Sequence, residues 1–205
     1  MGRCRSCSKT GSRKSSGVVV AKRDRKRENT QSRRGRTREL RPGHVLVVTG
    51  GERTEPAYIN GLARARGARV KVRSRTDSPE NLVRYAKRIF TTDEYDSVWC
   101  VVDVDEFDVE AAHAEAERLG VELVVSNPCF EIWLILHFAD HRAHVDNGKA
   151  CCRLLTKHVP GYDKSKVDYA VFDEGVEVAI KRAKELGPEN PSTDMWRLVE
   201  VLLKY

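Results

Sequence analysis

Short apolar runs alternate along this chain with longer amphipathic stretches. The short runs are rich in Val and are typical of buried β-strands; they lie at residues 44–49, 69–73, 97–102 and 121–125. The amphipathic stretches between them predict helices at residues 58–66, 79–90 and 108–119. Because strands and helices alternate, right-handed βαβ crossovers and a mainly parallel sheet are expected.

Helix-terminal signals support this assignment. Pro56 suits a first helical turn, Ser78 is a suitable cap with Pro79 just inside the helix, and Gly120 suits a helix end. Beyond Asn127 the pattern becomes helical, with helices expected at residues 130–138, 149–158, 175–186 and 193–204. The fold class is therefore α/β, with a sheet flanked by helices and a helical C-terminal part over residues 130–205.

The positive charge is concentrated in the first 42 residues. Residues 1–42 hold 15 Lys and Arg against 3 Asp and Glu, whereas residues 43–205 hold 22 against 27. We expect the first segment to be a disordered basic leader because it has little to bury. Such an arm favours RNA or DNA, since phosphate contacts release counterions; a solubilising tail and a contact with an acidic partner are the alternatives. The expected nucleic-acid-binding residues are Lys22, Arg23, Arg25, Lys26, Arg27, Arg33, Arg34, Arg36 and Arg38.

Composition also restricts the cellular setting. No stretch approaches the roughly 20 apolar residues that span a bilayer, and no apolar core follows the N-terminal charges as in a signal peptide. Cys100 and Cys129 lie in apolar runs and are interpreted as buried hydrophobic residues. We expect a reduced, cytoplasmic protein without membrane contact, and a homo-oligomer is left open.

Acidic residues directly follow the third predicted strand. The run Val101-Val102 ends in Asp103-Val104-Asp105, and alternate residues of an extended chain point to the same side. Asp103 and Asp105 are therefore expected side by side at the carboxyl end of the strand, where open α/β sheets bind ligands. Two carboxylates so close repel each other unless a cation lies between them, so a divalent metal site is expected.

Two more polar segments follow the first and fourth predicted strands, at residues 50–55 and 126–131. Because neighbouring parallel strands end at one crevice, these segments add acids to the same site. Such oxygen ligands favour Mg²⁺ or Mn²⁺, and a site of this kind suits phosphoryl transfer or phosphodiester hydrolysis. The further candidates are Glu52 and Glu55 as ligands or general base, with Glu106, Asn127, Glu131 and Arg53 around them.

Each candidate has a structural alternative. Glu52 and Glu55 suit the first turn of a helix, where the helix dipole favours acids. Asp103 and Asp105 suit a cap of the following helix. Tight-turn, solvated or ion-pair roles are the alternatives for Glu106, Asn127, Glu131 and Arg53. The loosely spaced His137, His141 and His144 lack an acid or cysteine at helical spacing and are interpreted as helix-end residues.

Several segments, taken in order, resemble the RloB family of prokaryotic proteins. A basic leader precedes them, and the longest is the unusual run Ser-Asn-Pro-Cys-Phe-Glu-Ile-Trp-Leu at residues 126–134. The similarity extends over nearly the whole chain. The other matching segments are residues 51–58, 78–83, 98–105 and 190–193.

The resemblance implies a Toprim-type fold, the metal-binding α/β module of topoisomerases, primases and several nucleases. In that module a glutamate after the first strand and an Asp-x-Asp after the third, here Asp103 and Asp105, bind Mg²⁺. RloB-like proteins are associated with phage defence and abortive infection. The expected activity is therefore a Mg²⁺-dependent endonuclease that cuts RNA, such as tRNA, or DNA. Related systems pair such a nuclease with an ATPase partner.

One position departs from the family pattern. The family typically has Glu-Gly-Glu-Lys-Thr-Glu after the first strand, and its first acid is the expected Toprim glutamate. Gly50 occupies that position here. Either Glu52 or Glu55 takes over the role, or the chain is a degenerate binding module that docks to an ATPase or a nucleic acid without cleavage.

Overall fold

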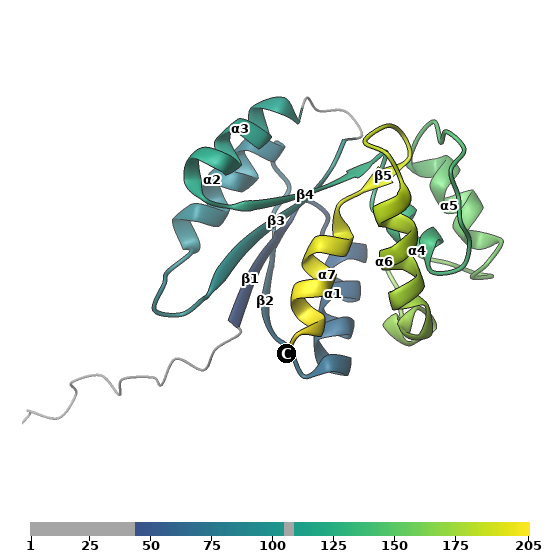
Figure 1. The fold of residues 1–205 in the computed structure, drawn as a ribbon, viewed down its shortest axis with the longest axis horizontal. Helices are drawn as coiled ribbons and strands as arrows, with labels where there is room; N and C mark the ends of the chain where they lie inside the picture. Colours follow the sequence, from purple (N-terminus) through teal and green to yellow (C-terminus); the bar gives the residue numbers. More distant parts are fainter. Residues whose placement is uncertain (1–43, 105–108) are drawn as a thin grey trace, which may run out of the picture. The chain divides into compact units, whose positions relative to one another are not determined.

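The computed structural model describes residues 44–104 and 109–205, and they form an α/β fold built on one five-stranded sheet. The strand order is β2-β1-β3-β4-β5, with β1 to β4 parallel and β5 antiparallel to β4 (Figure 1). The expected fold class is confirmed. The strands are β1 (His44–Thr49), β2 (Arg69–Ser74), β3 (Ser97–Asp103), β4 (Glu122–Asn127) and β5 (Ser192–Thr193).

Helices cover both faces of the sheet because its central strands are apolar on both sides. In β1, Leu46 and Val48 pack with α2 (Pro79–Ile89) and α3 (Glu110–Leu119). Val45 and Val47, which point to the other face, pack into a second core with α1 (Thr54–Arg66) and α7 (Met195–Leu203). Figure 1 shows the two helix pairs on opposite sides of the sheet. This two-sided burial explains the nearly continuous apolar runs of the parallel strands.

The C-terminal part adds helices to the second core. They are α4 (Glu131–Leu136), α5 (Gly148–Thr156) and α6 (Val176–Glu185), with two short 3₁₀ turns at Tyr169–Val171 and Asp173–Gly175. The helical prediction for this part is correct in outline but differs at two places. The helix predicted over residues 130–138 is shorter. The helix predicted over residues 193–204 begins only at Met195, because Thr193 and its neighbour Ser192 form β5 on β4.

Two local predictions are also confirmed. The Ser78 side chain accepts a hydrogen bond from the Asn81 backbone N–H, so Ser78 caps α2 as expected. Gly120 ends α3 in the left-handed conformation (φ 66°), which favours glycine. Among the described helices, none has the length and apolar character needed to cross a membrane. The expected leader, residues 1–42, lies outside the described residues.

Candidate functional site

A cavity of about 400 Å³ lies at the carboxyl edge of the sheet. Its walls come from the loop after β1, the end of β3, the start of α4 and a distant loop. A second cavity of about 440 Å³ adjoins it and shares five lining residues with it. The shared residues are Gly50, Gly51, Glu55, Thr76 and Asp103. This is the sheet edge at which α/β proteins bind ligands.

Of the two acids that follow β1, Glu52 and Glu55, Glu55 is the more deeply buried. It lies in the first turn of α1 and is 7 % exposed. Burial raises the pKa of Glu55, and the charge of Glu131 adds to this effect, while backbone hydrogen bonds from Glu55 and Gly51 and the charge of Lys164 oppose it. A buried carboxylate with a raised pKa suits either a general base or a cation ligand.

Gly51 allows the Glu55 carboxylate to lie close to the backbone. A Cβ atom at Gly51 would lie 2.1 Å from Glu55 Oε1, so a larger residue would displace the carboxylate. Gly50 differs, because a Cβ atom there would have its nearest neighbour, Leu82 Cδ1, at 3.4 Å. The site therefore has room for a Cβ atom at Gly50, whereas a Cβ atom at Gly51 requires the Glu55 carboxylate to move.

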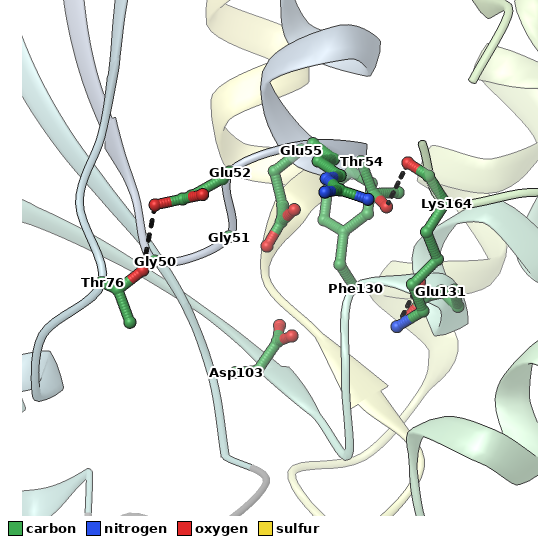
Figure 2. A pocket seen from close by; sticks show the side chains of 11 residues that line it. Gly50, Gly51, Glu52, Thr54, Glu55, Thr76, Asp103, Phe130, Glu131 and Lys164 are labelled. Carbon is green, nitrogen blue, oxygen red and sulfur yellow. Dashed lines mark hydrogen bonds and ion pairs between the residues drawn. The ribbon is translucent and has the colours of Figure 1, made fainter. Parts of the chain in front are cut away.

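Asp103 is the last residue of β3, one residue beyond the predicted end of the strand, and borders both cavities. Figure 2 shows the Asp103 and Glu55 side chains pointing toward each other across the cavity. Glu52 points away from this pair and accepts a hydrogen bond from Thr76 Oγ1 at 3.2 Å (Figure 2). Of the two glutamates left open by the sequence, Glu55 is thus the one that faces Asp103.

Glu131 contacts Lys164 and Tyr162, two residues that no sequence pattern indicated. It is 1 % exposed at the start of α4 and forms an ion pair with Lys164 Nζ at 2.8 Å. The Tyr162 hydroxyl donates to Glu131 Oε1 at 3.1 Å. Partial burial works against the Lys164 charge, but the hydrogen bond and charge of Glu131 outweigh it and raise the pKa of Lys164. The buried Glu131 is therefore neutralised by Lys164, whose own side chain is about half exposed.

Lys164 adds a cation, paired with Glu131, to the wall of the cavity. Its backbone carbonyl accepts a hydrogen bond from Thr54 Oγ1 at 3.4 Å, which connects the loop to the start of α1. The exposed Arg53 lines the same cavity. No local pattern could have selected Lys164, because it lies in a polar loop far along the chain from the other lining residues.

Of the remaining predicted site residues, Asn127 is not part of this group, and the others lie outside the described residues. Asn127 ends β4 but lines a different cavity, of about 710 Å³, beside β5. Asp105 and Glu106 lie outside the described residues, so their expected positions beside Asp103 stay predictions. The same applies to the basic residues between Lys22 and Arg38.

The cavity has the donor chemistry of a Mg²⁺ site but only part of a full ligand set. Glu55 and Asp103 supply the carboxylate oxygens that Mg²⁺ prefers. Burial raises the pKa of Glu55 and so disfavours its charged form, which a neighbouring cation would stabilise. Within residues 44–104 and 109–205, no three His, Cys, Asp or Glu side chains are grouped so as to hold a metal. The two facing carboxylates fit the ion as a partial site.

Fold and cavity together define the class: an α/β protein with an acidic site at the carboxyl edge of a mainly parallel sheet. The family model described as RloB-like protein matches residues 45–202. Since this match covers most of the chain, the protein belongs to the RloB-like family. No curated protein and no solved structure matches the chain.

Proposed function

We propose that this protein is a Mg²⁺-dependent endonuclease with a Toprim-type site, which hydrolyses phosphodiester bonds of RNA or DNA. The observation that supports this most directly is the pairing of Glu55 and Asp103 across a cavity at the carboxyl edge of the sheet. Membership of the RloB-like family is consistent with the proposal. A role in antiviral defence, with an ATPase partner, rests on that family resemblance.

The proposal gives each cavity residue a role. Asp103, with Asp105 beside it in sequence, would hold the ion, and Glu55 would act as the general base. Bound Mg²⁺ would supply an activated water and neutralise charge on the phosphate. Glu55 takes the proton of the attacking water, for which its raised pKa is suited. As water oxygen bonds to phosphorus, the bond to the leaving oxygen breaks and that oxygen is protonated from solvent. Arg53, which lines the cavity, would bind phosphate oxygens, and Lys164 would do so beside its ion pair with Glu131.

Glu55→Gln tests the proposal against its matched control, Glu52→Gln. With Mg²⁺ or Mn²⁺ and labelled tRNA, other RNA and DNA, wild-type protein is expected to cleave at least one substrate, and EDTA to abolish cleavage. Glu55→Gln is expected to lower the rate about 100-fold, because general base catalysis is lost, whereas Glu52→Gln stays close to wild type because Glu52 points to Thr76.

The pH profile gives a second readout for Glu55. A general base acts when deprotonated, so the wild-type rate should rise with pH as Glu55 loses its proton. This dependence should disappear in Glu55→Gln. Cleavage that resists EDTA, or equal rates in the two glutamine variants, would count against the proposal.

A second candidate function is nucleic-acid or partner binding without cleavage. Gly50 favours it, because glycine stands where the family pattern has its acid. The space around Gly50 makes Gly50→Glu a usable test. If the binding role is correct, wild type does not cleave and Gly50→Glu gains Mg²⁺-dependent cleavage. If the native chain is an endonuclease, wild type cleaves without the substitution.

A further inference from the structure

The edge strand β2 presents a row of positive side chains. Arg69, Lys71 and Arg73 alternate with Val70 and Val72. Val70 and Val72 pack against the core shared with α1, so the three bases point to the opposite face. The register agrees, because Lys71 pairs with Leu46 and Arg73 with Val48, both of which belong to the core on the α2 side.

This face of β2 lies at the margin of the sheet. β2 is the terminal strand and pairs only with β1 among the described strands. The nearest helix on that face, α2, packs over β1 and β3. Arg69 and Arg73 are exposed and Lys71 is half-buried. Among the described side chains, none forms an ion pair with any of the three.

The positive row extends toward the candidate site. Arg75, which forms an ion pair with Asp77 at 2.8 Å, follows at the same two-residue spacing, so the four bases span about 20 Å. The Arg75 guanidinium lies 5.0 Å from the centre of the Tyr85 ring, and Arg88 of α2 lies 5.3 Å from the same centre. The next residue, Thr76, lines both cavities. Basic residues therefore follow β2 and lead, through Arg75, to the edge of the cavity.

We propose that Arg69, Lys71 and Arg73, here called the β2 stripe, bind the phosphate backbone of a nucleic acid strand and direct it toward the cavity. The binding claim rests on charge complementarity, since regularly spaced bases without internal acid partners match a regularly charged polyanion. Only the direction toward the cavity rests on the proposed function. The stripe belongs to the folded body and is separate from the basic leader.

Charges on an edge strand also prevent strand pairing between copies of a chain. Charge of either sign would serve that role. All three residues are instead positive, and two further arginines, Arg75 and Arg88, continue the positive charge at the Tyr85 ring. The two roles predict different results when the bases are neutralised. Loss of phosphate contacts changes the salt dependence of nucleic-acid binding, and loss of edge protection causes self-association.

The test compares a triple variant, Arg69→Gln with Lys71→Gln and Arg73→Gln, with a control that removes the same charge elsewhere. The control is Lys149→Gln with Lys157→Gln and Lys181→Gln, three exposed lysines at α5 and α6. Both are made in the full chain, so the leader contributes equally. Binding of fluorescein-labelled single-stranded RNA and DNA, about 20 nucleotides long so as to exceed the stripe, is measured by anisotropy in EDTA at several salt concentrations.

The triple variant is expected to bind about 10-fold more weakly, with a slope of log K against log salt reduced by about 2, since each phosphate contact in a single strand contributes about 0.7. The control should keep the wild-type slope. A change with RNA alone or DNA alone supports the proposal and identifies the preferred strand. A wild-type slope on both probes overturns it, as does self-association with an unchanged slope.

Folding and function are separated in the same design. If thermal unfolding shows that the triple variant is not folded, single Arg69→Gln and Arg73→Gln variants are each expected to reduce the slope by about 0.7. Because binding is measured in EDTA, where metal-dependent cleavage is prevented, a reduced slope in the triple variant supports nucleic-acid binding by the β2 stripe even if the wild type never cleaves. If the wild type cleaves but the triple variant keeps the wild-type slope, the binding role of the β2 stripe is wrong and the proposed endonuclease activity is not affected.

Discussion

Asp103→Asn is expected to lower Mg²⁺-dependent cleavage about 1,000-fold, which corresponds to a loss of about 4 kcal/mol in transition-state stabilisation. Asp103 ends β3, a central strand, and faces Glu55 across the cavity. Asparagine keeps the shape of the side chain but removes the charge that would bind the ion. Calorimetric titration with Mn²⁺ should accordingly show metal binding to wild type and greatly weakened binding to Asp103→Asn.

Asp77→Asn is the matched control for this substitution. Asp77 lines the adjoining cavity, but its carboxylate pairs with Arg75 at 2.8 Å and accepts the Ser78 backbone N–H at 2.9 Å. Its charge is therefore engaged in the loop before α2, and cleavage should stay near the wild-type rate. Equal rates in wild type and Asp103→Asn would refute the assignment of Asp103 as a metal ligand.

The second large effect expected is a loss of stability at acidic pH caused by His137. Its side chain is 6 % exposed and lies near the rings of Tyr58, Trp133 and Phe172. His137 Nδ1 lies 2.9 Å from the Trp133 carbonyl oxygen, so it carries the proton and donates, and Nε2 accepts from the Tyr58 hydroxyl at 3.0 Å. Burial lowers the pKa of His137 to about 4, so the neutral form is folded into the core.

The direction of the pH effect follows from this lowered pKa. Above pH 6.5 both folded and unfolded states hold neutral His137, and its contribution to stability is complete. As the pH falls from about 6.5 to about 4, the unfolded chain takes up the proton first, and the free energy of unfolding decreases. The loss between pH 7.5 and 4.5 should be about 2.5 kcal/mol.

Urea unfolding at several pH values measures this effect. His137→Gln removes the titrating group while keeping a hydrogen-bond donor and an acceptor. Between pH 7.5 and 4.5, the free energy of unfolding should therefore decrease by about 2.5 kcal/mol less in this variant than in wild type. The same substitution at the exposed His113 is the control. Parallel pH curves for wild type and His137→Gln would show that burial of His137 does not govern acid stability.

His137 also illustrates the limit of the sequence interpretation. Its position at a helix end was predicted correctly, because it follows the last residue of α4. Its burial was not predicted, because the rings around it come from α1, α4 and a 3₁₀ region far apart in sequence. Similarly, Ser192 and Thr193 form a strand only because they pair with the end of β4. Two residues are too few to show a period of their own.

The sequence by itself determined the α/β class, the four parallel strands and the position of Asp103 at the end of β3. Strands buried on both faces are recognisable in the sequence as nearly continuous apolar runs. In a parallel sheet the last residue of each strand lies at the carboxyl edge. Only the tertiary structure decided which acids meet. Glu52, Glu55 and Glu131 all follow strands, but their surroundings differ. Glu52 is hydrogen-bonded to Thr76, and Glu55 fits against the backbone because residue 51 is glycine. Glu131 is neutralised by Lys164. These partners are brought together by packing, so no local pattern specifies them.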